Sequence, residues 1–582
     1  MGRIREMGFT MKRIFMQLAA VVLAVAVAVP MAAPARAARN DELTLRVGLA
    51  YGSSALVSAN LENNTGYGSG YRFGYYDSDL DFVELGRTSS SVTKLTMVKA
   101  QNIWVSGTSY STSDNGGELI GCYHVQMPGS YNSYNAAYSE ASDYSDGFVA
   151  WIDGAYQVRV GAYETKAEAE SRASSLGGTV VGTSSYAVNV TQTGKAKILF
   201  QFDGGSSTAL GIMPDVTGAG ETRTWFKGYR YPGGFRYERV NGGNLTVVNI
   251  VDMEDYLIGV VPYEMSDSWP LEALKAQAVC ARSYAYNSLN HHSSYHFDIC
   301  NGTDCQVYYG YGGGSTYNSN AARAVEETAG VYAKYNGKVI ETFYSASHGG
   351  ASESVYNVWG SSLSTYPDLC GVKDPYEADT ASMNPYSSWT VSYTTSTLTQ
   401  RLQSKGYGTG TSVASLDLTY SDLGNVIAVK VNYANGQSNT FKPTNMRSTF
   451  GISSIRFQVN SSGSGSGGTS DGSLPVNGPG SLPEQDSYYV ISGSGTVGKT
   501  DREDLYAISG SGSVDSVTSS SGGGSSVTEG NVVHVTGSSY VFEGSGNGHQ
   551  IGMSQWGAYA MAKRGFTYDE IITFYFPGTT VG

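Results

Sequence analysis

Charged side chains are scarce in this sequence, and basic ones are the scarcer kind. Asp, Glu, Lys and Arg make up 15% of the 582 residues, and the net charge is −13, whereas roughly 25% of an average soluble domain is charged. Nucleic acids and other polyanions are bound by clustered lysine and arginine residues that replace their counterions. A nucleic-acid partner is therefore not expected.

Long apolar runs are absent after the first 37 residues, so no later segment is predicted to span a membrane. Residues 1–37 combine basic residues, an apolar run from Ile14 to Val29 and the small-residue sequence Ala35-Arg36-Ala37. This order is typical of a secretory signal peptide cleaved after Ala37, which predicts a secreted or cell-surface protein. A retained membrane anchor is the disfavoured alternative, because the run is shorter than the roughly 20 residues that span a bilayer.

Cysteine is also rare, and its odd number means that the thiols cannot all pair within one chain. The five cysteines are Cys122, Cys280, Cys300, Cys305 and Cys370. Glycine and tyrosine are abundant instead, with 74 and 44 residues. Tyrosine is common in β-rich folds, and its flat ring with a hydroxyl tip can also stack on the face of a sugar.

The length exceeds that of a single hydrophobic core, so several domains are expected. Changes in composition and periodicity divide the chain into a signal peptide (1–37), a β-rich region (38–118), a small domain of two strand-helix-strand units (119–192), a large domain dense in strand and helix signals (193–460), a Gly/Ser-rich flexible insertion (461–530) and a segment that completes the large domain (531–582). The predicted fold class is α+β, multidomain, with packed helices in the β-rich large domain.

The small domain repeats one pattern, in which alternating apolar residues give way to an alanine-rich helix and then to another strand. Its second half, from Tyr156-Gln-Val-Arg-Val-Gly-Ala-Tyr to Gly178-Thr-Val-Val, resembles the sporulation-related repeat (SPOR) domain. The resemblance implies binding to glycan strands stripped of their peptides. A generic ferredoxin-like fold fits the same pattern and remains an alternative.

A helix is predicted from about Trp269 to Asn287. Pro270 suits the first turn of a helix, and Glu272 lies where the helix dipole favours an acid. Small and apolar residues recur three or four positions apart, so one face can lie close against another element. Glu264 falls in the turn just before this helix, where a carboxyl group can be held and partly desolvated.

Three motifs follow one another in the chain. They are Gly259-Val-Val-Pro-Tyr-Glu-Met with Glu272-Ala-Leu-Lys-Ala-Gln-Ala-Val-Cys-Ala-Arg, then Phe343-Tyr-Ser-Ala-Ser-His-Gly-Gly-Ala-Ser-Glu, then Gly548-His-Gln-Ile-Gly-Met-Ser-Gln-Trp-Gly-Ala. Together they resemble the stage II sporulation protein D family, which includes the amidase enhancers of the LytB type. The resemblance extends from Val251 to Gly578, about half of the chain.

The resemblance implies lytic transglycosylase activity, which cleaves the MurNAc-GlcNAc bond of peptidoglycan and forms a 1,6-anhydro end. Glu264 would be the catalytic acid. Hydrolysis of a glycosidic bond ordinarily uses two carboxylates, but a transglycosylase can use one, because the 6-hydroxyl of the sugar replaces water. The alternative is a structural role, in which Glu264 caps the helix that follows.

The same motifs suggest a set of substrate-binding residues, namely Arg282, His348, Glu353, His549, Ser554 and Gln555. The family has glycine directly after the histidine of its last motif, whereas this sequence has Gln550. The sequence therefore does not determine the conformation of that loop, and His549 could instead belong to a turn that defines the fold.

A metal site is a further expectation. His296, Cys300 and Cys305 offer three ligands for a structural zinc ion, with His292 as a fourth, although Asp304 stands where a ligating histidine is expected. A Cys300–Cys305 disulfide is the preferred of the two interpretations, because disulfides form outside the cell. No cofactor is required by the predicted chemistry. The expected partners are peptidoglycan glycan strands and a cell-wall amidase, and a non-catalytic enhancer of such an amidase is the alternative function.

Overall fold

The computed structural model covers the chain with gaps, and its described residues are 43–63, 69–215, 223–312, 319–462 and 531–582, with short strands between 474 and 529. The predicted signal peptide and most of the predicted insertion lie outside them. Among the described residues, no helix combines the length and the apolar character needed to cross a bilayer. The structure is a mixed α+β fold with several sheets, as predicted from the sequence.

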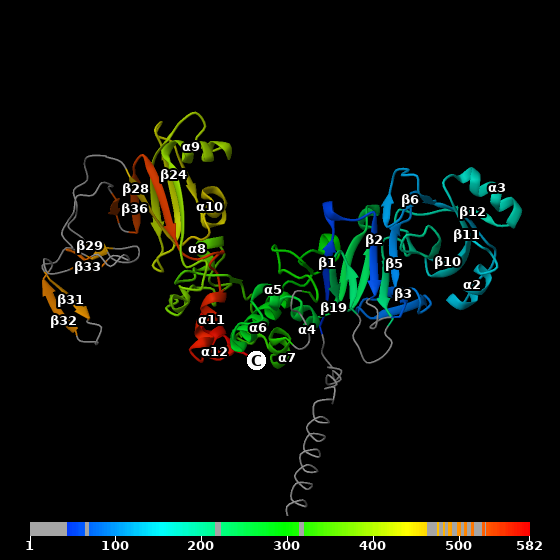
Figure 1. The fold of residues 1–582 in the computed structure, drawn as a ribbon, viewed down its shortest axis with the longest axis horizontal. Coiled ribbons are helices and arrows are strands. Elements are labelled where there is room, and N and C mark those ends of the chain that lie inside the picture. The colour runs from blue at the N-terminus through cyan, green and yellow to red at the C-terminus, as the bar shows by residue number, and fades with distance from the viewer. Residues whose placement is uncertain are drawn as a thin grey trace, which may run out of the picture. The chain divides into compact units, whose positions relative to one another are not determined.

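A seven-stranded sheet lies beside the helices that carry the candidate site (Figure 1). Its strands, in spatial order, are β20 (Ile299–Cys300), β1 (Thr44–Ala50), β19 (Thr246–Asp252), β18 (Gly234–Glu238), β15 (Leu210–Pro214), β3 (Tyr71–Tyr76) and β4 (Phe82–Arg87). Almost every residue of β19 is buried, and four of its seven residues are Val or Ile, which favour strands. The parallel pairing of β20 with β1 brings Cys300 to the edge of this sheet.

A second sheet has ten strands and contains the predicted strand-helix-strand units. These units are β9 (Tyr123–Gln126), α2 (Tyr134–Ala141), β10 (Gly147–Ile152), β11 (Ala155–Tyr163), α3 (Lys166–Leu176) and β12 (Thr179–Gly182). Their order in the sheet, β12-β9-β11-β10, is that of a ferredoxin-like unit. The two predicted repeats therefore form one pseudo-symmetric α/β unit, a topology that the SPOR resemblance and the generic alternative share.

The ten-stranded sheet continues from this unit into strands on both sides of it in the sequence. They are β14 (Ile198–Asp203), β13 (Val188–Gln192), β5 (Lys94–Lys99), β2 (Ser58–Asn63), β16 (Thr224–Phe226) and β17 (Tyr229–Tyr231). Strand β10 pairs in parallel with β14, and β5 pairs with β13. The expected boundary at residue 193 therefore does not coincide with the edge of a sheet, because non-local strand pairing joins the regions on its two sides.

Helix α6 (Leu271–Asn287) lies at the centre of a helical cluster. Its neighbours are α4 (Met253–Ile258), α5 (Val261–Glu264), α7 (Asn320–Glu327), α11 (Gln555–Lys563) and α12 (Tyr568–Tyr575). Figure 1 shows α11 and α12, in red, beside the green α6, although they lie far away in the sequence. The predicted helix begins two residues later than expected, because Pro270 occupies the N-cap.

A third β-region consists of two sheets. The first has three strands, in the order β24 (Trp389–Thr394), β37 (Ser539–Gly544) and β28 (Phe457–Ser462). The second has five strands, in the order β27 (Ser438–Phe441), β26 (Val426–Tyr433), β25 (Val413–Tyr420), β36 (Val532–Thr536) and β35 (Ser526–Glu529). Its helices are α8 (Val355–Trp359), α9 (Thr395–Ser404) and α10 (Pro443–Phe450). Strands β36 and β37 follow the predicted insertion and pair with strands that precede it. Residues after 531 thus complete sheets begun before residue 460.

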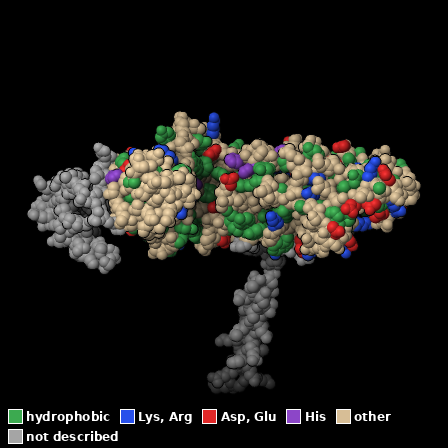
Figure 2. All heavy atoms as spheres, turned by 90° about the horizontal axis from the view of Figure 1, so that it is seen from above, with side chains coloured by type: hydrophobic (Ala, Val, Ile, Leu, Met, Phe, Trp, Pro, Cys, Tyr) green, Lys and Arg blue, Asp and Glu red, His purple; other side chains and the backbone are tan. Residues whose placement is uncertain are grey.

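Shorter strands form small two- and three-stranded sheets. They are β6 (Ile103–Ser106), β7 (Ser109–Ser111), β8 (Glu118–Ile120), β21 (Ala333–Tyr335), β22 (Lys338–Val339), β39 (Thr580–Val581), β23 (Tyr344–Ser345), β38 (Met553–Ser554), β29 (Leu474–Pro475), β30 (Ser481–Leu482), β31 (Ser487–Ile491), β32 (Val497–Asp501), β33 (Tyr506–Ile508) and β34 (Val514–Ser516). Figure 2 shows one face of the molecule, where uncharged surface predominates and basic side chains lie singly or in small groups.

Gly557 of α11 gives a test of this packing. A Cβ atom at this position would lie 1.8 Å from the Tyr575 hydroxyl and 2.3 Å from the Asp374 carboxylate. Replacing glycine by alanine inside a helix ordinarily stabilises by about 1 kcal/mol, but we expect Gly557→Ala to destabilise by about 1 to 3 kcal/mol because of this overlap. Urea unfolding measures the change. Gly182→Ala, whose nearest neighbour would be 3.6 Å away, is the control, and a stabilised Gly557→Ala protein would contradict the described packing.

Candidate active site

Glu264 is the last residue of the short helix α5, which has Pro262 in its first turn. The backbone nitrogen of Glu264 donates to the Val260 carbonyl at 3.2 Å, and the next residue, Met265, is buried in the core. The carboxyl group is therefore held on a rigid turn, and the residue keeps partial exposure to solvent.

The environment of the Glu264 carboxyl is polar and uncharged. Gln555 Nε2 donates to Glu264 Oε2 at 3.3 Å and to Gln277 Oε1 at 3.3 Å. Burial raises the pKa of Glu264, and hydrogen bonds from Gln555, the Val307 backbone and the Tyr344 hydroxyl offset part of this rise. The carboxyl group thus holds its proton at a higher pH than an exposed glutamate does.

The alternative role as a helix cap is not supported. Pro270 is the N-cap residue of α6, and no side chain caps this helix. The carboxyl of Glu264 instead contacts side chains from β23 and α11.

Two motifs meet at Glu264 through a short parallel ladder. Strand β23 pairs with β38, with Tyr344 opposite Met553 and Ser345 opposite Ser554. Tyr344 of this ladder and Gln555, the residue that follows it, both hydrogen-bond the Glu264 carboxyl. Tyr344 also accepts a hydrogen bond from Gln306 Nε2 at 3.0 Å. Sequence reasoning did not single out Tyr344 or Gln306, since neither is a typical acid, base or metal ligand.

Glu377 is a buried carboxylate that the motifs did not indicate. It accepts hydrogen bonds from the Ser347 hydroxyl, from the His348 backbone nitrogen at 3.0 Å and from the Ser554 hydroxyl at 3.0 Å. Burial raises the pKa of Glu377, and these hydrogen bonds lower it in part. Glu377 therefore links the motif of Ser347 and His348 to the motif of Ser554 by hydrogen bonds. This role is visible only in the tertiary structure.

His348 and Ser554 were predicted to bind substrate, and the structure corrects both predictions. Each is 0% exposed. Ser554 caps α11 by accepting from the Gly557 nitrogen at 3.1 Å. The ring of His348 contacts the Ser345 hydroxyl at 3.1 Å, and burial, with the nearby His549, lowers the pKa of His348 to about 3. Both side chains hold the loops and cannot reach a ligand in this conformation.

Glu353 is also buried, at 1% exposure, so its predicted contact with substrate is wrong. One carboxylate oxygen accepts from the Asn357 amide at 2.8 Å, and the other accepts from the Ser421 hydroxyl at 2.5 Å and the Asn425 amide at 3.1 Å. Glu353 thus links the start of α8 to the β25–β26 turn.

Arg282 requires the same correction. Its side chain is 0% exposed, and it forms two hydrogen bonds to Glu254, at 2.9 and 2.6 Å. It also donates to the Val331 carbonyl at 3.1 Å. The predicted substrate contact is therefore replaced by a buried ion pair that joins α6 to α4.

The loop of the third motif keeps its geometry despite the change from glycine to Gln550. Gln550 has φ +62°, a left-handed conformation that glycine adopts more easily. Its buried amide compensates by donating to the His348 carbonyl at 2.8 Å and accepting from the Ile455 nitrogen at 2.8 Å. The side chain thus replaces the conformational freedom of glycine with specific hydrogen bonds.

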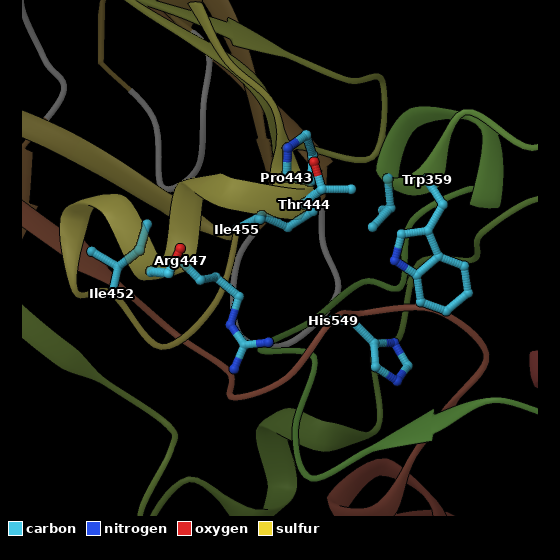
Figure 3. A pocket seen from close by; sticks show the side chains of 9 residues that line it. Trp359, Pro443, Thr444, Arg447, Ile452, Ile455 and His549 are labelled. Atoms are coloured by element: carbon cyan, nitrogen blue, oxygen red, sulfur yellow. The ribbon is translucent and has the colours of Figure 1, made fainter. Parts of the chain in front are cut away.

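His549 is partly exposed and lines a cavity of about 440 Å³ (Figure 3). Its Nδ1 accepts from the Ile551 nitrogen at 3.1 Å, which leaves the proton of the neutral ring on Nε2. Burial, followed by the charge of Arg447, lowers the pKa of His549 to about 4. Of the predicted substrate-binding residues, only His549 and Gln555 lie at an accessible cavity or beside Glu264.

The predicted metal site has a different set of residues from the one expected. The donor atoms of His292, Cys300, Asp304 and Cys305 all lie within 4.8 Å of one another. His296 instead forms a 2.5 Å contact with Glu238 and is half exposed, so its place among the ligands is wrong. The sulfurs of Cys300 and Cys305 are not bonded to each other. Two thiols, an imidazole and a carboxylate at this spacing fit the four-coordinate donor set of a structural zinc ion.

Comparison with known proteins assigns a family to the central part of the chain. Residues 241–335 match the family model described as Stage II sporulation protein (SpoIID). The matched segment contains Glu264, the Arg282–Glu254 pair and the cluster of His292, Cys300, Asp304 and Cys305. The chain therefore carries a domain of the Stage II sporulation protein family.

Three relatives extend this similarity beyond the matched segment. An amidase enhancer of Bacillus subtilis (strain 168) is 32% identical over 328 residues, which cover 56% of this chain and 40% of that protein. Stage II sporulation protein D of the same strain is 26% identical over 352 residues, covering 58% of this chain and 76% of the relative. An uncharacterized protein of Brachyspira hyodysenteriae is 29% identical over 364 residues, covering 62% and 75%. The chain thus spans less than half of the amidase enhancer.

The buried ion pair gives a prediction that separates a structural role of Arg282 from a binding role. Arg282→Ala would leave the carboxylate of Glu254 buried without its partner, so we expect it to destabilise the protein by about 3 to 5 kcal/mol. The double variant Arg282→Met/Glu254→Gln removes both charges and should lose less stability. Thermal unfolding measures both. A variant of Arg282 that folds with unchanged stability but binds glycan more weakly would contradict the structural role.

Proposed function

We propose that this chain is a peptidoglycan lytic transglycosylase that cleaves MurNAc-GlcNAc bonds, with Glu264 as its acid and base, in cell-wall remodelling or sporulation. The observation that carries the proposal is a single partly exposed carboxyl with a raised pKa, held by Gln555 and Tyr344. Two relatives, one named for sporulation and one for amidase enhancement, support the cell-wall setting. We further propose that the ferredoxin-like unit binds glycan strands.

In the proposed reaction, protonated Glu264 gives its proton to the glycosidic oxygen while the bond from that oxygen to C1 of MurNAc breaks. The resulting carboxylate accepts the proton of the 6-hydroxyl of the same sugar as its oxygen bonds to C1. The products are a free GlcNAc hydroxyl and a 1,6-anhydro-MurNAc end. Water is not consumed, and Glu264 ends the cycle protonated, so no second carboxylate is needed.

A second candidate function is a non-catalytic enhancer of a cell-wall amidase. The 32% identity to the amidase enhancer over 56% of this chain supports it. Under this hypothesis the chain binds glycan without cleaving it, and the amidase is the partner.

Product analysis separates the two functions. We expect the full chain, incubated with peptide-free glycan strands, to release fragments with anhydro-muramyl ends that mass spectrometry detects. Glu264→Gln should lower the rate about 100-fold or more, because an amide cannot donate the proton. Asp267→Asn, a nearby acid with no place in the mechanism, is the control. Wild-type protein that yields no anhydro ends but accelerates an added amidase would favour the enhancer.

The pH dependence of the same reaction follows from the raised pKa of Glu264. The rate should stay high below this pKa and fall as pH rises through it, because the acid must be protonated. The raised pKa of Glu264 also makes the stability of the folded protein depend on pH. Its stabilising contribution to folding is fully present below the ordinary glutamate pKa and is lost as pH rises through the raised value. Glu264→Gln should therefore weaken this loss of stability with pH, as unfolding at several pH values would show.

We also propose that His292, Cys300, Asp304 and Cys305 hold a structural zinc ion. We expect one zinc per chain by elemental analysis, its loss in Cys305→Ser and its retention in His296→Ala, since His296 faces Glu238. Metal removal should also lower the unfolding temperature. Absence of metal together with a Cys300–Cys305 bond, found by thiol titration, would refute the zinc proposal.

A further inference from the structure

A cavity of about 440 Å³ opens between α8, α10 and the loop of His549 (Figure 3). We name it the Arg447 pocket. It is lined by Val358, Trp359, Pro443, Thr444, Arg447, Ser448, Ile452, Ile455 and His549. In Figure 3 the side chain of Arg447 extends from α10 toward the loop that carries His549, and Trp359 lies on the facing wall.

Backbone and side-chain hydrogen bonds hold the walls of this pocket together. The Gly548 nitrogen donates to the Ser453 carbonyl at 3.1 Å, and the Ile455 nitrogen donates to Gln550 Oε1 at 2.8 Å. These bonds tie the loop of His549 to the chain that follows α10. The cavity is therefore a formed feature of the fold rather than a gap between independent loops.

Arg447 is the charged group of the pocket, and it lacks an acidic partner among the described residues. Its Nε is buried without a hydrogen-bond partner. Burial lowers the pKa of Arg447, which shows that its charge is partly desolvated without compensation. Its position in the last turn of α10 favours a cation through the helix dipole, but the dipole provides no acceptor for the guanidinium N–H groups. An anion in the pocket would provide one.

The other residues that line the Arg447 pocket indicate what kind of anion it could bind. His549 is neutral near pH 7, because its pKa is lowered to about 4, so the pocket carries one positive charge. Trp359 is 38% exposed and lies 5.4 Å from His549, ring centre to ring centre. The side chains of Val358 and Ile455 add apolar surface, and Thr444 and Ser448 add hydroxyl groups. This lining suits a carboxylate attached to a sugar or another compact group with an apolar face.

We propose that the Arg447 pocket binds a carboxylate of the muropeptide unit, with Arg447 as the residue that recognises the charge. This proposal rests on the proposed function, since it identifies a further group of the same proposed substrate. Two sources offer the same chemistry: the lactyl carboxylate of muramic acid on a peptide-free strand, and a carboxylate of the stem peptide. Arginine suits either, because its N–H groups pair with both carboxylate oxygens.

The test measures binding rather than cleavage. Glu264→Gln in the full chain, which is expected to be inactive, is titrated calorimetrically with a peptide-free muramyl-glucosaminyl tetrasaccharide and with the methyl ester of that tetrasaccharide. We expect the acid to bind about tenfold more tightly than the ester, or about 1.4 kcal/mol, because the ester removes the charge from the acceptor of the Arg447 hydrogen bonds. Adding Arg447→Met should make the affinities for acid and ester equal. Adding Lys405→Met, which removes an exposed charge outside the pocket, should leave the discrimination unchanged.

A third ligand, the peptide-bearing tetrasaccharide with its acid and ester forms, identifies the source. If the acid form binds more tightly than the ester form only for this peptide-bearing ligand, and only with Arg447 present, the recognised carboxylate belongs to the stem peptide. Equal affinity for acid and ester in both ligand pairs would overturn the proposal, and so would discrimination that persists in Arg447→Met. The comparison of acid with ester on intact Arg447 requires no variant of the pocket, so misfolding cannot mimic the result. Failure of the proposed function would appear separately, as the absence of anhydro ends from wild-type protein.

Discussion

The close contact between α6 and α11 is the interaction on which the rest of the site depends. Gln277 on α6 and Gln555 on α11 are 278 residues apart in the chain, and their side chains are joined by a hydrogen bond of 3.3 Å. The same Gln555 amide reaches Glu264, so the position of the candidate acid is set by a helix from the other end of the domain. Small buried residues occur on both helices. Ala273, Ala276 and Ala281 of α6 are fully buried, and Gly557 of α11 leaves room for Tyr575.

Buried carboxyl groups organise the surroundings of this contact, and hydrogen bonds rather than cations satisfy most of them. Glu377 joins Ser347, His348 and Ser554, while Glu353 joins α8 to a turn of the next sheet. Arg282 with Glu254 is the exception, a buried ion pair within the helical cluster. Removing a carboxylate from water is costly, so each persists only where several donors converge. Glu264 has fewer donors and keeps partial exposure, which distinguishes a group that can exchange a proton from the groups that hold the fold.

The parts of the site come from residues before and after the long segment 461–530. The cost of bringing the ends of a loop together grows only slowly with its length. A long Gly/Ser-rich stretch between β28 and β36 therefore does not prevent α11 from packing on α6, and the strands on its two sides still pair. The fold also tolerates Gln550 at the position where the family motif has glycine. Gln550 keeps a left-handed backbone conformation, and its side chain is stabilised by buried hydrogen bonds.

Local patterns in the sequence determined the α+β class, the ferredoxin-like unit, the central helix and the acid at position 264, since each depends on periodicity, capping or a contiguous motif. The motifs also marked His348, Glu353, Ser554 and Arg282 as substrate-binding residues, whereas in the structure they are buried and form the frame of the site. Composition cannot separate these roles, because burial depends on which distant segments pack against a side chain. Only the tertiary structure decided that Tyr344 and Gln555 both hydrogen-bond Glu264, that Asp304 joins His292, Cys300 and Cys305 in one cluster while His296 lies apart, and that Arg447 lines an open cavity. Each of these results depends on contacts between segments far apart in the chain, whose geometry is settled by packing of the whole core and not by the residues beside each site.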